Sequence, residues 1–336
     1  MRIGIDVGGT NTDSVLIDGT QIVRKSKTTT TEDITNGVKN SLHAILPSEE
    51  KNLGVDAVMI GTTHFTNALL QKNGLATTAA LRLCLPATQM LPPMVDWPKE
   101  MKESIKGYTY LVDGGFEFDG REISTIDKGQ IRRAADDMAN KGVEAISISG
   151  IFSSVDPTQE QIAAQIIQEE TPHIKISMSH EIGRVGVLER ENATILNACL
   201  STTSDSVVGA FKKAVEELNL GSALFLTQND GTLMDADFAT KYPVYSISSG
   251  PTNSMRGAAF LTGIQNAIVA DVGGTSTDVG ILRNGFPRES SIAVEIGGIR
   301  TNFRMPDVLS IALGGGSVVN TSPITICLLY TSDAAD

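Results

Sequence analysis

An eight-residue stretch rich in glycine, hydroxyl and carboxylate side chains occurs twice in the chain. Residues 6–13 read Asp-Val-Gly-Gly-Thr-Asn-Thr-Asp, and residues 271–278 repeat them with one change, Ser276 in place of Asn11. An apolar run precedes and follows each copy, which predicts a strand, a tight glycine turn and a second strand. Glycine suits such a turn because a residue without Cβ enters the positive-φ region at little cost.

The chemistry that these two turns offer is phosphate binding beside a hydrated metal ion. Backbone N–H groups of adjacent glycines and nearby hydroxyls can converge on a phosphate, as a backbone nest does. We expect Asp6 and Asp271, where the first strands end, to be catalytic and metal-binding, orienting waters on Mg²⁺ or an attacking water, since Mg²⁺ keeps most of its hydration shell. The residues expected to bind nucleotide phosphates are Gly8, Gly9, Thr10, Asn11, Thr12, Gly273, Gly274, Thr275, Ser276 and Thr277.

The repeat differs from the common glycine-rich nucleotide motifs, because it fits neither G-x-x-x-x-G-K-[ST] nor G-x-G-x-x-G. Two unrelated hairpins are the alternative, since Gly-Gly is an ordinary hairpin turn. Near-identity over eight positions favours a shared role. Duplicated hairpins that face each other across a cleft hold the nucleotide in actin-like, sugar-kinase and Hsp70-type ATPases, and this repeat resembles theirs.

A second cluster of polar residues follows a predicted buried strand near residue 60. Glycine and hydroxyl residues stand between that strand and a predicted helix, an arrangement typical of a loop that faces a site. Thr62, Thr63 and Asn67 are therefore candidates for contacting substrate, although N-capping of the helix explains the two threonines as well. His64 lies among them, and a lone histidine is more often a structural hydrogen-bonding residue than a catalyst.

Two further glycine sites are candidates for the nucleotide. Gly250 stands in a Ser-Gly-Pro sequence at the predicted start of a helix, whose free N–H groups suit a phosphate or an anionic substrate. A plain capped helix is the alternative there. Gly314, Gly315, Gly316 and Ser317 follow an apolar strand, and adjacent glycines let a backbone lie flat against adenine or a phosphate. A flexible linker is the alternative for this stretch.

Composition limits the class of protein. The chain has 336 residues, 41% hydrophobic and 20% charged, which is enough for two globular domains. A net charge of −12 argues against a nucleic-acid-binding surface. Cys84, Cys199 and Cys327 share no short spacing, so neither a disulfide framework nor a zinc site is indicated. Met1 leads directly into a strand and no apolar run approaches the ~20 residues of a membrane helix. We therefore expect a cytoplasmic protein with no membrane contact.

The order of the predicted elements indicates an α/β fold. Helices alternate with strands, as in a largely parallel sheet. A long helical stretch over residues 188–218 is expected to bridge two domains. We place the first domain at residues 1–185, with the first hairpin, and the second at 186–320, with the second hairpin and the triple glycine. Residues 321–336 are expected to be a tail outside both domains.

Taken together, these motifs resemble the hydantoinase/oxoprolinase family over about residues 1–320. The resemblance implies a two-domain, actin/Hsp70/sugar-kinase-like ATPase fold. It also implies ATP- and Mg²⁺-dependent opening of a cyclic amide, such as a hydantoin or 5-oxoproline, by phosphorylation of the amide oxygen and attack of water. The expected partners are a hydantoinase B-type subunit and further copies in an oligomer. A sugar- or acetate-kinase-like phosphotransferase and a nucleotide-binding but inactive subunit are the alternatives.

The sequence departs from this family in two places. Leu309 and Ser310 stand where relatives usually have histidine and threonine, which predicts that a polar group near the cleft is missing. Residues from about Ser322 do not resemble the continuation of the family. We therefore expect a truncated reading frame with a foreign tail and an incomplete second domain.

Overall fold

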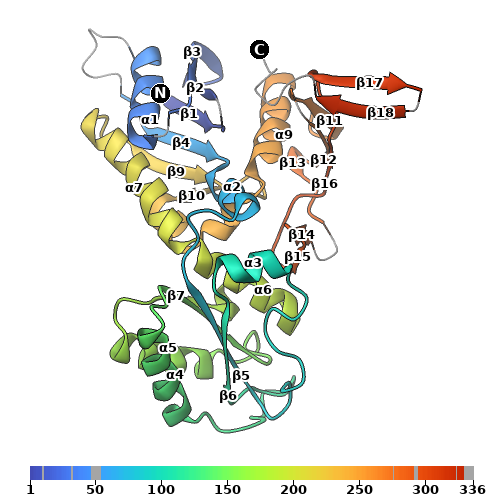
Figure 1. Cartoon of the computed structure of the whole chain (residues 1–336). Helices are drawn as coiled ribbons and strands as arrows, with labels where there is room; N and C mark the ends of the chain where they lie inside the picture. Colours follow the sequence, from blue (N-terminus) through green and yellow to red (C-terminus); the bar gives the residue numbers. More distant parts are fainter. Residues whose placement is uncertain are drawn as a thin grey trace.

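A computed structural model describes residues 1–9, 11–31, 33–46, 54–274, 276–290, 294–322 and 324–328. The described chain forms three lobes, two of which stand side by side above the other in Figure 1. The first lobe contains the first hairpin, the second lobe lies below it, and the third lobe contains the second hairpin. Of the expected tail, residues 323 and 329–336 lie outside the described residues.

The first lobe is built on a six-stranded sheet of order β10-β9-β4-β1-β2-β3. β1 pairs antiparallel with β2 and parallel with β4, and β4 pairs parallel with β9. The mixed sheet therefore has a hairpin at one end and parallel strands in its middle. Its strands are β1 (Arg2–Val7), β2 (Asn11–Asp18), β3 (Gln21–Thr29), β4 (Ala57–Thr62), β9 (Ala223–Thr227) and β10 (Leu233–Asp235).

Helices α1 (Ile34–Ile45) and α7 (Ser201–Glu217) pack together on this lobe. Ile3, Ile5 and Val7 alternate along β1 and are buried in the same core cluster as residues of these helices. The period of two leaves Gly4 and Asp6 on the opposite face of the strand. The sequence pattern of β1 therefore decides which face carries the carboxylate.

The second lobe is a four-stranded parallel sheet of order β6-β5-β7-β8. Every residue of β7 is buried, as expected for a parallel sheet covered on both faces. Helices α4 and α5 pack together on this lobe, and α3 lies at its upper end (Figure 1). The bounds are β5 (Thr78–Leu85), β6 (Tyr108–Asp113), β7 (Ala145–Gly150), β8 (Lys175–Met178), α3 (Lys99–Ser104), α4 (Lys128–Asn140) and α5 (Thr158–Glu170).

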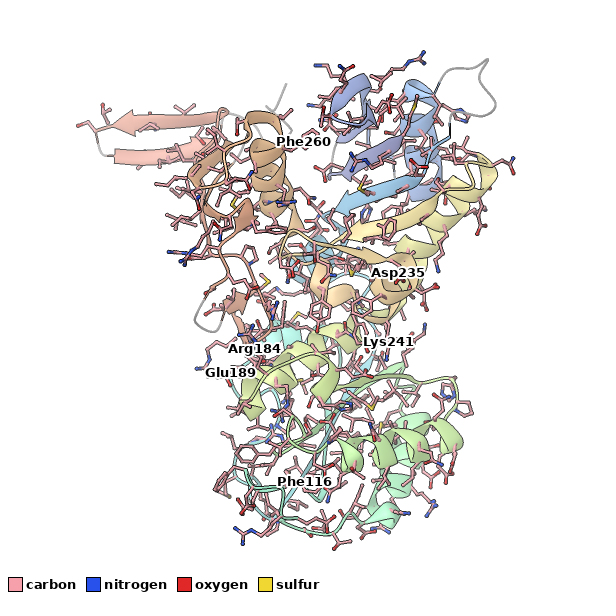
Figure 2. All side chains as sticks on the ribbon, turned by 180° about the vertical axis from the view of Figure 1, so that it is seen from behind. Phe116, Arg184, Glu189, Asp235, Lys241 and Phe260 are labelled. Atoms are coloured by element: carbon pink, nitrogen blue, oxygen red, sulfur yellow. The ribbon has the colours of Figure 1, made fainter. Side chains whose placement is uncertain are left out.

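Helix α6 (Val187–Cys199) joins the lobes. The expected helix over residues 188–218 is two helices, α6 and α7, with Leu200 between them. Residues 190–199 of α6 are all buried, and the helix packs on β7 of the second lobe and on β15. Figure 2 shows Arg184, Glu189 and Lys241 near this junction, with Phe116 in the second lobe and Phe260 in the third.

The third lobe combines one helix with the second hairpin. Helix α9 (Ser249–Thr262) packs on β11, β12 and β13, and β16 extends the sheet beside β12. The remaining elements are short. The bounds are β11 (Ala267–Val272), β12 (Thr277–Arg283), β13 (Phe286–Pro287), β14 (Val294–Ile296), β15 (Ile299–Thr301), β16 (Val308–Ile311), β17 (Ser317–Thr321), β18 (Ile324–Leu328), α2 (His64–Gln71), α8 (Ala236–Lys241), η1 (Ser179–Glu181) and η2 (Pro243–Ser246).

The expected domain boundary at residue 185 does not follow the sheets. β9 and β10, which come after that boundary, belong to the sheet of the first hairpin. The sequence does not show this because parallel pairing of β9 with β4 joins residues far apart in the chain. Within the described residues, none of the helices combines the length and apolar character needed to cross a membrane.

Candidate functional site

The two hairpins have the same register. Asp6 lies opposite Asp13 in the first, and Asp271 lies opposite Asp278 in the second. The turns close in the same way, because the Gly8 N–H donates to the Asn11 carbonyl at 3.0 Å and the equivalent bond in the second copy is 2.9 Å. The duplicated sequence therefore forms duplicated structure.

The glycines of these turns serve a different purpose from the one expected. None of Gly8, Gly9, Gly273 and Gly274 has positive φ. A Cβ on Gly8 would lie 3.0 Å from the Asn11 carbonyl oxygen, so the small residue is needed for the close approach of the two strands. The first N–H of each glycine pair is used inside its turn. Within the described residues, the N–H groups of Gly9 and Gly274 donate no hydrogen bond.

The hydroxyls expected to bind phosphate are only partly available. Thr12 is buried, and its Oγ1 lies 2.9 Å from Oγ1 of Thr30. The Thr277 hydroxyl donates to the Leu313 carbonyl at 2.6 Å. Both side chains are therefore committed to the fold. Thr10 and Thr275 lie outside the described residues.

The carboxylates of Asp6 and Asp271 belong to different lobes, and the charge of Asp271 acts on Asp6. The pKa of Asp6 is raised by burial first, then by the negative charges of Asp13 and Asp271. Ser254, on α9, donates to Oδ2 of Asp271 at 2.5 Å. Gly61 makes room on the other side, because a Cβ there would lie 3.0 Å from Oδ1 of Asp6. The same Cβ would lie 2.5 Å from Nδ2 of Asn253 on α9, so α9 lies beside Asp6 as well as Asp271.

The residues around Asp6 fit a Mg²⁺ ion that arrives with a phosphate. No cluster of three or more His, Cys, Asp or Glu side chains suited to a metal is present in the described part of the chain. Mg²⁺ does not require one, because it is commonly held by one or two carboxylates, waters and substrate phosphates. A cation would also relieve the repulsion that raises the pKa of Asp6. Asp6 and Asp271 are the residues that would hold it.

The triple-glycine loop is attached to the second hairpin. The N–H groups of Gly315 and Gly316 donate to the carbonyls of Gly273 and Gly274 at 2.9 and 2.8 Å. A Cβ on Gly314 would lie 2.6 Å from the Gly273 oxygen. The loop is therefore a fixed part of the hairpin rather than a linker, and these two N–H groups are already used.

An interlobe cavity of about 480 Å³ joins residues of the first and third lobes. The start of α2 meets the start of α9 there, and the buried Ser249 Oγ, which lines the cavity, has no hydrogen-bond partner among the described residues. A polar ligand could supply that partner. Five of the predicted residues line it: Thr62, Thr63, Asn67, Gly250 and Ser276. Pro251 of the Ser-Gly-Pro sequence lines it as well.

The departure at Leu309 and Ser310 leaves this cavity polar. Ser310 lines it, and its hydroxyl donates to the Asp278 carboxylate. Leu309 is the neighbouring residue of β16 and is 63% exposed. Because side chains alternate along a strand, Leu309 lies on the opposite face of the sheet. The predicted loss of a polar group therefore does not occur at this cavity.

A further cavity, of about 800 Å³ and here called the Asp6 cavity, lies on the face of the first sheet that carries Gly4 and Asp6, opposite the core. It contains Asp6 and Asp13 together with Lys25 and Lys27, and Asn253 of α9 also lines it. The two lysines give this space positive charges beside the carboxylates. Sequence reasoning missed them because β3 has no motif, and only the pairing of β3 with β2 brings them next to Asp13 and Val15.

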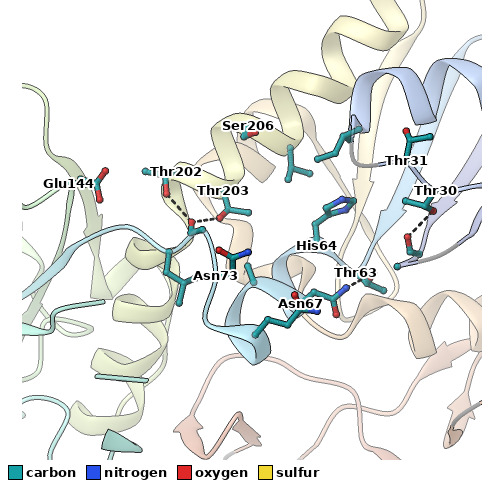
Figure 3. A pocket seen from close by; sticks show the side chains of 18 residues that line it. Thr30, Thr31, Thr63, His64, Asn67, Asn73, Glu144, Thr202, Thr203 and Ser206 are labelled. Carbon is teal, nitrogen blue, oxygen red and sulfur yellow. Dashed lines mark hydrogen bonds between the residues drawn. The ribbon is translucent and has the colours of Figure 1, made fainter. Parts of the chain in front are cut away.

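A hydroxyl cavity of about 830 Å³ lies beside the first hairpin turn (Figure 3). Its polar side chains come from the segment after β3, from α2 and the residues beside it, from α7, and from Glu144 of the second lobe, and they lie around His64. The Nδ1 of His64 lies 2.6 Å from the Thr62 hydroxyl, and burial lowers the pKa of His64. The described lining residues are Gly8, Gly9, Thr30, Thr31, Ile34, Thr63, His64, Asn67, Ala68, Gln71, Asn73, Gly74, Leu75, Glu144, Thr202, Thr203, Ser206 and Val207.

The duplicated hairpins and the helix between their carboxylates define an α/β ATPase-like fold of the actin type. A family model for the hydantoinase/oxoprolinase N-terminal region matches residues 2–171, and the hydantoinase/oxoprolinase model matches residues 190–325. Together these matches cover most of the chain. The chain belongs to the hydantoinase/oxoprolinase family.

Three relatives show how the chain compares with longer proteins. It is 27% identical to caprolactamase subunit alpha of Pseudomonas jessenii, over 95% of this chain and 48% of that protein. It is 26% identical to acetophenone carboxylase gamma subunit of Aromatoleum aromaticum, over 94% of this chain and 47% of that protein. The crystal structure of ATP-dependent caprolactamase from Pseudomonas jessenii superposes with a TM-score of 0.75 at 25% identity, and the match covers 95% of this chain and 49% of that one. The chain thus spans about half the length of these relatives.

Proposed function

We propose that this chain is the nucleotide-holding part of an ATP-dependent enzyme that opens a cyclic amide. The observation that carries the proposal is the placement of Asp6 and Asp271, one from each copy of the repeat, beside the same helix α9. Two carboxylates with glycine turns beside them provide what a Mg-nucleotide needs. The similarity to caprolactamase subunit alpha supports a lactam-type ring as the second substrate.

The proposed chemistry activates an unreactive amide. The amide oxygen attacks the γ-phosphorus of ATP, and the bond from that phosphorus to the β–γ bridging oxygen breaks as ADP leaves. Water then adds to the activated ring carbon, and the ring C–N bond breaks to leave an amine and an acyl phosphate. A second water releases phosphate and the carboxylate. In such a phosphoryl transfer the protein mainly positions the reactants and neutralises charge.

Each candidate residue has a role in this proposal. The N–H groups of Gly9 and Gly274 are the donors for phosphate oxygens, since Gly8 and Gly273 use theirs inside the turns. Bound Mg²⁺, held by Asp6 and Asp271, would supply charge neutralisation at the phosphates. The lysines of the Asp6 cavity add positive charge beside Asp6. The triple-glycine loop fixes the position of the second turn and borders the nucleotide.

The proposal includes a partner. The relatives named above are an alpha and a gamma subunit of multisubunit enzymes. We therefore expect the ring-opening activity to require a hydantoinase B-type subunit and an oligomer, and the chain to provide the ATP-dependent step.

The test is release of ADP that depends on a cyclic amide. The chain is combined with ATP, Mg²⁺ and a B-type subunit, and ADP is measured with ε-caprolactam, hydantoin or 5-oxoproline. We expect at least one ring to stimulate ADP release, and Asp6→Asn and Asp271→Asn to abolish the stimulation. Asp18→Asn, at the exposed end of β2, is the matched control and should retain it. ATP turnover that none of the rings changes would contradict the proposal, and phosphate transfer to a hydroxyl would indicate a kinase.

A further inference from the structure

The hydroxyl cavity borders the turn of the first hairpin. Gly8 and Gly9 form part of its wall, and the first turn of α2 separates it from the interlobe cavity. Thr63 and Asn67 line both cavities. A group that enters the hydroxyl cavity therefore reaches the same two side chains as a group held between the lobes.

The chemistry of the wall is polar but carries little charge. Among the described lining residues, Glu144 is the only acidic side chain and no lysine or arginine is present. Glu144 is already engaged, because its Oε2 accepts the Thr77 N–H at 2.7 Å. Burial lowers the pKa of His64, which therefore faces the cavity as a neutral imidazole at pH 7. The wall offers neutral donors and acceptors but no counter-charge for an anion.

Apolar side chains complete the wall and suit the carbon atoms of a ring. Ile34, Ala68, Leu75 and Val207 line the cavity between the hydroxyl and amide groups. Small-molecule sites commonly combine apolar walls with a few polar groups that fix orientation. The Asp6 cavity differs from this one, because it contains Lys25 and Lys27. The side chains of the Asp6 cavity thus suit a polyanion with its cation better than those of the hydroxyl cavity do, and the turn at Gly8 and Gly9 forms one edge of the hydroxyl cavity.

We propose that the hydroxyl cavity binds the cyclic amide and that it selects rings without a carboxylate. The inference rests on the proposed function and names the substrate class for it: lactams and hydantoins rather than 5-oxoproline. A carboxylate placed here would lose its hydration without gaining a charged partner, which disfavours its binding. A neutral amide can exchange hydrogen bonds with Thr63, Asn67 and Ser206 at little cost. The hydroxyls of Thr202 and Thr203 already donate to the Gly74 carbonyl and can only accept from the amide N–H.

The proposed binding location of the cyclic amide is tested by placing a larger side chain on α7, where it fills part of the hydroxyl cavity. The side chain of Ser206 is exposed on the wall and makes no hydrogen bond with the described residues, so Ser206→Phe adds volume without removing a side-chain hydrogen bond of the fold. Glu216→Phe places the same ring at an exposed position of α7 outside the cavity and is the matched control. Binding of δ-valerolactam is measured by calorimetry in the presence of Mg²⁺ and a non-hydrolysable ATP analogue, with binding of the analogue measured separately.

We expect Ser206→Phe to weaken lactam binding by roughly tenfold or more, as the loss of about 1.4 kcal/mol would, and to leave the affinity for the ATP analogue unchanged. Glu216→Phe should leave both affinities unchanged. Unchanged lactam binding in Ser206→Phe would overturn the location. A parallel loss of nucleotide affinity would also overturn it, because the cavity would then hold the nucleotide.

The selectivity is tested with 5-oxoproline and a new charge. The natural sequence should bind δ-valerolactam and hydantoin more tightly than 5-oxoproline. Gln71→Arg places a guanidinium on the wall, where Gln71 is exposed, and should raise the affinity for 5-oxoproline by roughly tenfold, because a charge-assisted bond is about twice as strong as a neutral one. Equal affinity of the natural sequence for both rings would overturn the selectivity. Binding of none of the rings would instead refute the proposed function itself.

Discussion

The carboxylate of Asp271 raises the pKa of Asp6, although the two residues belong to different lobes and different copies of the repeat. Burial raises it most, and Asp13, directly opposite on β2, contributes next. The two hairpins therefore share one electrostatic environment. Two carboxylates whose charges act on each other favour a bound cation, because a cation stabilises both charged forms.

This relationship predicts that removing either neighbouring charge lowers the pKa of Asp6. Asp13→Asn should lower it more than Asp271→Asn, following the order of the two causes. The measurement is a carboxyl NMR titration of Asp6 in each variant. Mg²⁺ with nucleotide should lower the same pKa, since a bound cation favours the charged carboxylate. A titration of Asp6 that is the same in the natural sequence and Asp271→Asn would show that the hairpins do not interact.

The contact between the triple glycine and the second hairpin predicts a sharp difference between two adjacent glycines. Gly314→Ala would place Cβ 2.6 Å from the Gly273 oxygen, whereas Cβ of Gly315→Ala would lie 3.8 Å from the same oxygen. We expect Gly314→Ala to destabilise the protein by about 1–3 kcal/mol, as overpacking does, and Gly315→Ala to have a small effect. Urea unfolding of both variants measures this. Equal effects would indicate that the loop does not rest on the hairpin.

The buried pair Arg82 and Glu191 predicts a large stability loss when one partner is neutralised. Both side chains are fully buried, and Arg82 Nε donates to Glu191 Oε1 at 2.8 Å. Glu191→Gln leaves the guanidinium without its counter-charge, which should cost about 3–5 kcal/mol. Asp119→Asn, which breaks the exposed pair with Arg121, should cost about 0–1 kcal/mol. Chemical denaturation compares the two, and similar losses would contradict the assigned burial.

His64 predicts a pH dependence of stability. Burial lowers its pKa from the ordinary value of 6.5, so below pH 6.5 the unfolded chain takes up a proton that the folded chain accepts only at lower pH. The unfolded state then binds more protons, and the free energy of unfolding falls as the pH drops from 6.5 through the folded pKa. The slope for one such group is at most about 1.4 kcal/mol per pH unit. His64→Gln should flatten this part of the curve in urea unfolding between pH 5 and 8. Identical slopes would show that the imidazole is not protected by burial.

The sequence by itself determined the local structure that the chemistry uses. The eight-residue repeat predicted two hairpins, and the alternation of apolar residues along β1 left Asp6 on the face opposite the core. Helix and strand periodicity likewise gave the α/β class, because both periods are properties of neighbouring residues. The family resemblance, which the family models confirm, rested on the same short motifs.

Only the tertiary structure decided which of the expected groups are available and what lies around them. The hydroxyls of Thr12 and Thr277 are committed to contacts with Thr30 and Leu313, and no local pattern shows such contacts between distant segments. The same holds for β9, which joins the first sheet by parallel pairing with β4. The wall of the hydroxyl cavity comes mainly from the first hairpin turn, residues 30–34, α2 and α7, so the lack of basic side chains among its described residues appears only after the chain has folded. Spacing along a chain records local geometry, whereas the composition of a cavity depends on which distant segments pack together.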